Sequence, residues 1–151
     1  MKKTISLVGI GLLLVSMVSV SCAPMPKTVI TKSNLPALKG NWQGWTTFSS
    51  LPSAPVLTYL QFTNDTVPVQ GSITLNNLPD NVALAFPADS KTAGGNVTID
   101  FKNGMITDQG LLIGQSGQNF LELTYYAGEK PKIDGWFYYY GSKGTVEFRK
   151  K

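Results

Sequence analysis

The chain has 151 residues, of which 42% are hydrophobic and 15% charged, and its 13 basic and 9 acidic residues give a net charge of +4. It contains one cysteine and no histidine. Within this chain these counts exclude a disulfide, a catalytic histidine, a Ser-His or Cys-His relay and a histidine-ligated metal site. The length and the apolar content fit one folded domain rather than a disordered segment.

A short apolar run near the N-terminus predicts a signal peptide. Lys2 and Lys3 precede an uncharged run over residues 5–20. As a helix this run would rise about 24 Å, less than the roughly 30 Å of a bilayer's hydrocarbon core. A basic start, a short apolar core and small residues after it are the pattern of a secretory signal. An uncleaved signal anchor is the alternative interpretation.

The one cysteine follows this run directly. The segment Ser19-Val20-Ser21-Cys22 resembles the lipobox of bacterial lipoproteins, although Ser19 stands where Leu or Val is commonest. The resemblance implies that residues 1–21 are removed, that Cys22 is lipidated, and that the protein is anchored to a membrane of the bacterial cell envelope. Ala23 implies the outer membrane if the source is Gram-negative. A free thiol beside an ordinary cleavage site is the alternative.

Removal of residues 1–21 takes away Lys2 and Lys3 and lowers the net charge from +4 to +2. The charge therefore does not indicate a nucleic-acid partner. Residues 22–36 contain three prolines among polar residues, a composition that favours an extended tether. Residues 27–31 have a second interpretation, as a strand added to the edge of the domain over residues 37–151.

From Leu38 onward, apolar and polar residues alternate with the period of half-buried strands, and β-branched and aromatic residues are frequent. Turn signals separate the alternating segments, the strongest being Asn103-Gly104, which suits a type I′ hairpin turn. The predicted strands cover residues 39–48, 56–63, 67–75, 82–86, 96–102, 105–113, 119–126, 132–140 and 144–149.

Short connections between consecutive strands favour hairpins, and closure of the sheet would remove exposed edges. The sequence therefore predicts an all-β fold, a small antiparallel up-and-down β-barrel of about 8–9 strands, with a β-sandwich as the alternative. Gly40-Asn41-Trp42 resembles the opening of lipocalin-like and avidin-like barrels. That resemblance implies that Trp42 packs across the base of the barrel, and the alternation places Thr46 and Phe48 on the same inward face.

A second set of aromatic residues falls on the opposite face. Trp45 alternates with Trp42, and Trp136, Tyr138 and Tyr140 share one face of a strand whose other face is also aromatic. Since only one face can line the core, the other predicts an exposed aromatic surface, which would stack on sugars or insert into a partner protein. Cover by a loop, or simple cross-strand pairing, is the alternative.

No spacing of carboxylates or hydroxyls requires a catalytic site, and no motif indicates a metal or cofactor. The expected function is therefore that of a membrane-anchored, non-catalytic binding or inhibitory module. Its ligand would be a protein or a small apolar or sugar molecule, held by the aromatic surface or the barrel mouth. A structural accessory subunit of an outer-membrane or envelope complex is the alternative.

Overall fold

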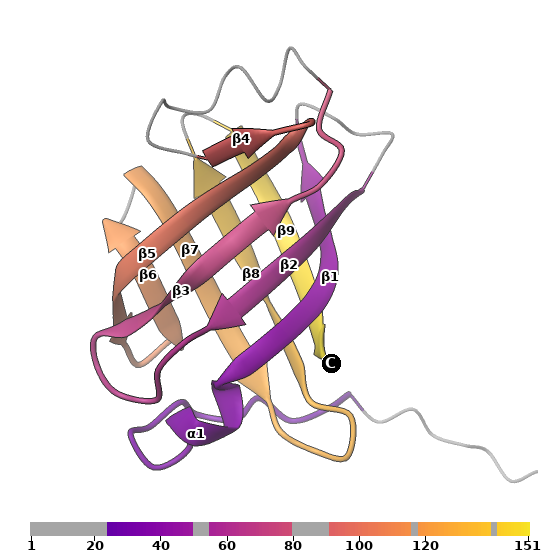
Figure 1. Cartoon of the computed structure of the whole chain (residues 1–151). Coiled ribbons are helices and arrows are strands. Elements are labelled where there is room, and N and C mark those ends of the chain that lie inside the picture. Colours follow the sequence, from indigo (N-terminus) through magenta and orange to yellow (C-terminus); the bar gives the residue numbers. More distant parts are fainter. Residues whose placement is uncertain (1–23, 50–54, 80–90, 116–117, 140–141) are drawn as a thin grey trace, which may run out of the picture.

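The structure, a computed structural model, describes residues 24–49, 55–79, 91–115, 118–139 and 142–151, which form one short helix and nine strands (Figure 1). In chain order these are α1 (Leu35–Leu38), β1 (Gly40–Phe48), β2 (Val56–Phe62), β3 (Val69–Leu75), β4 (Lys91–Ala93), β5 (Asn96–Ile106), β6 (Leu111–Gln115), β7 (Gln118–Tyr126), β8 (Lys132–Tyr139) and β9 (Ser142–Lys150).

Eight of the strands form a closed antiparallel barrel. Neighbours pair in the order β3-β2-β1-β9-β8-β7-β6-β5, and the pairing of β3 with β5 closes the ring. Among the described residues, β4 pairs with β5 alone and extends the wall as a short hairpin arm. The predicted up-and-down barrel is thus confirmed, and the sandwich alternative is wrong.

The strongest predicted turn is wrong. β5 continues through Asn103-Gly104, and the chain reverses at Thr107–Gly110, where the Thr107 N–H donates to the Gly110 carbonyl at 2.8 Å. Gly104 lies opposite Val69, where a Cβ would come within 2.9 Å of the valine side chain. Close approach of two strands therefore explains this glycine. The paired positive φ angles of a type I′ turn occur at Gly94-Gly95, at 58° and 77°.

This error displaced one predicted strand, because the strand expected over residues 105–113 begins only at Leu111. The strand expected over residues 82–86 lies outside the described residues. The six predicted strands that correspond to β1, β2, β3, β7, β8 and β9 agree with the structure to within two residues at each end.

The inward faces of the strands form one apolar core. β1 alternates strictly, so that Trp42, Thr46 and Phe48 are buried, as predicted. The indole Nε1–H of Trp42 donates to the Leu38 carbonyl at 2.7 Å, and its ring meets Tyr125 edge-on at 6.2 Å between centroids. Thr46 and the buried Thr58 satisfy each other's hydroxyl groups at 2.8 Å. The barrel therefore buries these polar atoms with partners.

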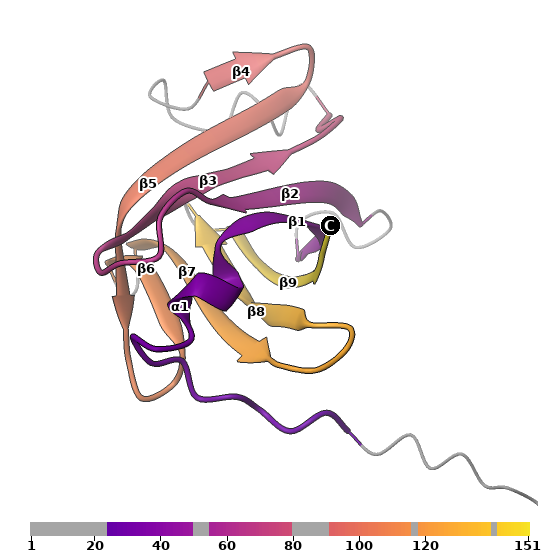
Figure 2. The same cartoon turned by 60° about the horizontal axis from the view of Figure 1, so that its bottom comes forward.

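The segment before β1 packs against the barrel, and α1 lies across the end from which β1 begins (Figure 2). Ile30, Leu35 and Leu38 are only 2–3% exposed and belong to the core cluster. Upstream, Thr28 forms an isolated antiparallel bridge with Tyr125. Within the segment expected as an extended tether, residues 22–36, Ile30 and Leu35 therefore pack into the end of the barrel.

Residues 27–31, whose alternative interpretation was an edge strand, form no strand in the structure and pair with the sheet only through the bridge between Thr28 and Tyr125. The predicted signal peptide and Cys22 lie outside the described residues. Within the described ranges, no helix has both the length and the apolar character needed to cross a membrane.

Candidate functional site

Two of the three tryptophans point outward from the barrel wall. The side chains of Trp45 in β1 and Trp136 in β8 are 53% and 46% exposed, whereas their strand neighbours Thr46 and Phe137 are buried. Tyr138 lies on the same outer face as Trp136 and is half-buried. Tyr140, which was predicted to belong to this surface, lies outside the described residues. Among the described residues, the exposed aromatic surface therefore consists mainly of the indoles of Trp45 and Trp136.

A glycine precedes each exposed tryptophan and faces the interior of the wall. A Cβ at Gly44 would overlap the backbone carbonyl of Glu147 in β9, and one at Gly135 would overlap the carbonyl of Glu122 in β7. Each Gly-Trp pair thus lets the neighbouring strand approach closely on one side while the next side chain projects to the other. The two Gly-Trp dipeptides therefore place both rings where neighbouring strands of the barrel approach each other closely.

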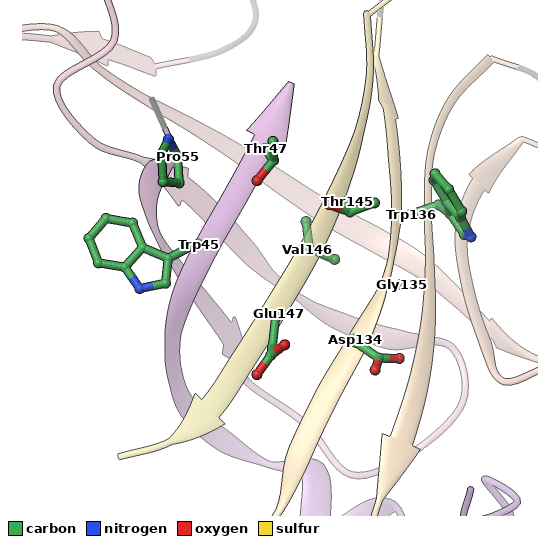
Figure 3. Close-up of a pocket in the computed structure, with 9 residues that line it drawn as sticks. All are labelled: Trp45, Thr47, Pro55, Asp134, Gly135, Trp136, Thr145, Val146 and Glu147. Atoms are coloured by element: carbon green, nitrogen blue, oxygen red, sulfur yellow. The ribbon is translucent and has the colours of Figure 1, made fainter. Parts of the chain in front are cut away.

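The register of β1, β9 and β8 places polar residues between the rings. Trp45 lies opposite Glu147, which lies opposite Asp134. In the adjacent row, Thr47 lies opposite Thr145, which lies opposite Trp136. The two indoles therefore occupy opposite corners of a patch three strands wide, with two threonines and two carboxylates between them (Figure 3).

This patch is an open groove of about 650 Å³ on the outer wall. Its lining comes from three strands and one residue of the connection before β2. The lining residues are Trp45, Thr47, Pro55, Asp134, Gly135, Trp136, Thr145, Val146 and Glu147. In Figure 3, Trp45 and Trp136 stand at the two sides, and the side chains of Thr145, Glu147 and Asp134 project between them. We call this feature the Trp45–Trp136 groove.

Each carboxylate of the Trp45–Trp136 groove has a cationic partner two residues along its own strand. Lys132 Nζ lies 2.7 Å from Asp134 Oδ2, and Arg149 Nη2 lies 3.1 Å from Glu147 Oε1. Lys132 and Arg149 are themselves register partners. Two acids and two bases therefore form a compact block with no net charge.

One member of this block, Lys132, and the neighbouring Tyr126 have raised pKa values. The hydrogen bond to Asp134 is the main cause that raises the pKa of Lys132 above its ordinary 10.5, and partial burial opposes it. Burial, followed by the negative charge of Asp134, raises the pKa of Tyr126. Lys132 also lies over the Tyr126 ring, with its Nζ 4.5 Å from the ring centroid. The Lys132 ammonium is thus fully charged at neutral pH.

This pair gives a pH-dependent prediction for stability. Lys132→Met is expected to lower the free energy of unfolding by at most about 1 kcal/mol at pH 7, since both partners are partly solvated. A raised lysine pKa in the folded state contributes stability below the unfolded value, and that contribution is lost as the pH rises through the folded value. From pH 7 upward, urea unfolding should therefore show a constant difference up to about pH 10.5, which then shrinks. A difference that grows over this alkaline range would contradict the prediction.

Lys143 covers part of the Trp136 ring. Its Nζ lies 4.2 Å from the ring centroid, a distance typical of a cation–π contact. Lys143 is the register partner of Tyr138, one row beyond Thr145. Lys143 thus contacts Trp136 from the side of Tyr138. The groove instead extends from Trp136 toward Thr145 on the neighbouring strand.

The end of the barrel beneath α1 offers less space. Trp42, Ile73, Phe101 and Phe148 are buried in the core cluster, and Ile99 packs against it. Between Ile30, Leu38, Phe62, Tyr125 and other core side chains, the remaining space does not admit a water molecule. The end of the barrel covered by α1 is therefore packed and does not form an open mouth.

Sequence reasoning found the two indoles but missed most of the groove. Thr47, Pro55, Thr145 and Glu147 were not singled out as site residues. The strand alternation did place Thr47, Thr145 and Glu147 outward, but their association depends on the β1–β9 pairing. Among the described residues, no group of three or more acidic, histidine or cysteine side chains is placed to hold a metal ion.

Comparison of the chain with protein-family models, with curated proteins and with solved structures finds no match. The interpretation of the Trp45–Trp136 groove therefore rests on its own geometry and chemistry.

Proposed function

We propose that the protein is a non-catalytic binding module, anchored to the bacterial envelope through Cys22, and that it takes its ligand in the Trp45–Trp136 groove. The observation that carries the proposal is the exposure of two large aromatic rings on one wall of a closed barrel. An outward strand face is ordinarily polar, so exposed indoles at both sides of a groove are typical of a recognition surface.

The arrangement supports binding better than catalysis. Both carboxylates are held in ion pairs, and the hydroxyls of the lining belong to Thr47 and Thr145, with no histidine anywhere in the chain to act as their base. The barrel wall also keeps the rings in fixed strand register, which lowers the entropy lost when a ligand binds. A preorganised surface with aromatic ends and a polar centre suits reversible recognition.

The binding part is tested by co-sedimentation with envelope fragments from the source bacterium. The mature chain carrying Cys22→Ser is used, so that lipid anchoring does not contribute. We expect Trp45→Ala with Trp136→Ala to reduce the sedimenting fraction at least tenfold, because both ring contacts are removed. The matched control is Val29→Ala with Met105→Ala, which removes two exposed apolar side chains elsewhere on the surface and should leave sedimentation unchanged. Equal loss in the two double variants, or no loss in either, would refute the groove as the site.

The anchoring part has an independent test, mass spectrometry of the mature N-terminus. The expected product begins at Cys22 and carries acyl chains, each buried CH₂ of which adds about 0.8 kcal/mol of membrane affinity. Cys22→Ser should remain in the precursor form. An intact Met1 or an unmodified Cys22 in the wild-type protein would reject the anchor and leave the groove hypothesis standing.

A further inference from the structure

We infer that the ligand of the Trp45–Trp136 groove is a neutral glycan chain of at least two sugar rings. The inference rests on the proposed binding function and names its ligand class. It follows from three features of the groove: the balance of its charges, the separation of its indoles, and the hydrogen-bonding groups between them.

The charge balance favours a ligand without net charge. The ion pairs Lys132–Asp134 and Arg149–Glu147 place two positive and two negative groups side by side on adjacent strands. Such a block has little net field to attract an anion or a cation, because each charge is offset by its neighbour. The two charged residues that flank Trp136 are also of opposite sign, since Lys143 lies over its ring and Glu122 of β7 is its register partner. It nevertheless presents fixed donors and acceptors, which can hydrogen-bond to uncharged hydroxyl groups.

The separation of the indoles favours a chain over a single sugar. Trp45 and Trp136 are two strands apart and displaced by two residues along the strands. With strands spaced about 4.8 Å apart and residues about 3.4 Å apart, their Cα atoms lie about 12 Å from each other. One pyranose ring cannot stack on both indoles at that distance, whereas successive rings of an oligosaccharide can.

The polar centre fits the hydroxyl-rich edge of such a chain. Thr47 and Thr145 are register partners with exposed side chains, so their hydroxyls can donate and accept. Sugar rings combine hydroxyl edges with C–H faces, and the C–H faces pack on the flat apolar surface of an indole. Aromatic ends and a hydroxyl and carboxylate centre thus match the two surfaces of a pyranose chain.

A protein partner fits less well. Binding hot spots in protein interfaces cluster apolar anchors at the centre, whereas here polar groups separate the two rings. β1, β9 and β8 also lie inside a closed ladder, so the groove offers no free strand edge to which an extended peptide could add. A protein ligand is therefore the alternative that the experiment distinguishes from a glycan.

The test is titration of the mature Cys22→Ser chain, followed by tryptophan fluorescence and calorimetry. The probes are the neutral tetrasaccharides tetra-N-acetylchitotetraose, cellotetraose and maltotetraose, with N-acetylglucosamine and glucose as single-ring controls. A chitosan tetramer and a galacturonate tetramer supply the cationic and anionic comparisons. We expect at least one neutral tetrasaccharide to bind at least tenfold more tightly than its monosaccharide and than both charged tetramers.

Two further measurements assign this binding to the groove. Trp45→Ala and Trp136→Ala should each weaken it at least tenfold, whereas Val29→Ala with Met105→Ala should not change it. High salt should leave the affinity within about twofold, because screening acts on charged ligands. Strong salt dependence, or preference for a charged tetramer, would overturn the assignment to a neutral glycan.

Failure of this inference is distinguishable from failure of the proposed function. If no neutral tetrasaccharide binds at millimolar concentration while co-sedimentation still requires the two tryptophans, the glycan class is wrong and the binding groove stands. Loss of that co-sedimentation after protease treatment of the envelope fragments would then identify a protein ligand. If neither measurement depends on Trp45 or Trp136, both proposals fall.

Discussion

Removal of residues 1–38 is expected to lower the free energy of unfolding by at least about 4 kcal/mol, whereas removal of residues 1–26 should leave it unchanged. The difference lies in three side chains, Ile30, Leu35 and Leu38, which are buried against the end of the barrel. Full burial of such a side chain contributes about 1.5–3 kcal/mol. The longer deletion also removes the Leu38 carbonyl, the acceptor for the buried indole N–H of Trp42.

Chemical denaturation of the two truncated chains, beside the mature chain, measures this effect. The chain that begins at residue 27 keeps the Thr28 bridge to Tyr125 and should unfold at the same denaturant concentration as the mature chain. The chain that begins at residue 39 should unfold at a much lower concentration or fail to fold. Equal midpoints for the two truncations would show that the N-terminal segment does not contribute to the core.

The packed segment also changes what an anchor at Cys22 would do. Tether residues 22–36 would have spanned about 50 Å, but only five residues separate Cys22 from Thr28. The six Cα–Cα steps from Cys22 to Thr28 span at most about 22 Å. If Cys22 is lipidated, the end of the barrel covered by α1 therefore lies close to the membrane surface, and the Trp45–Trp136 groove opens to the side of the barrel.

The barrel wall was predictable because its signal is local. Alternation in β1 alone decided that Trp42 faces inward and Trp45 outward, and the same alternation in β8 separated Phe137 from Trp136. Each of these assignments needs only the two-residue period of a strand and the rule that one face lines the core. The residues of the partner strands are not needed for these assignments.

The errors arose where a distant contact overrides a local preference. Asn103-Gly104 has the composition of a tight turn, but Val69 on the neighbouring strand needs a residue without a side chain opposite it. The segment before β1 has no apolar period, because Ile30 and Leu35 are placed by the shape of the barrel end and not by a helix or strand repeat. Neither contact can be deduced from residues near it in the sequence.

The groove also depends on contacts between residues that are far apart in the sequence. Trp45 and Glu147 are far apart in the chain, and only the pairing of the first strand with the last makes them neighbours. Alternation could show that both side chains point outward, but the register decides that they lie side by side in the groove. The site was therefore predictable as a pair of exposed rings and not as a groove with a polar centre.

Trp42→Ala is expected to lower the free energy of unfolding by about 3–5 kcal/mol, whereas Trp45→Ala on the same strand should change it by about 0.5 kcal/mol or less. Trp42 is fully buried, contacts Tyr125 edge-on and donates to the Leu38 carbonyl, so its removal leaves a cavity and an acceptor without its donor. Trp42→Phe keeps most of the apolar volume but not the hydrogen bond, and should cost less than the alanine variant.

Urea unfolding monitored by circular dichroism measures all three variants, since the far-ultraviolet signal does not depend on which tryptophan remains. A large loss of stability in Trp45→Ala would mean that this ring supports the fold, and its effect on ligand binding would then be indirect. A small loss in Trp42→Ala would contradict the packing of the barrel base. The expected contrast between Trp42 and Trp45 shows that Trp45 is a surface residue. If Trp45→Ala retains wild-type stability, its loss of binding is due to the missing contact between the indole and the ligand.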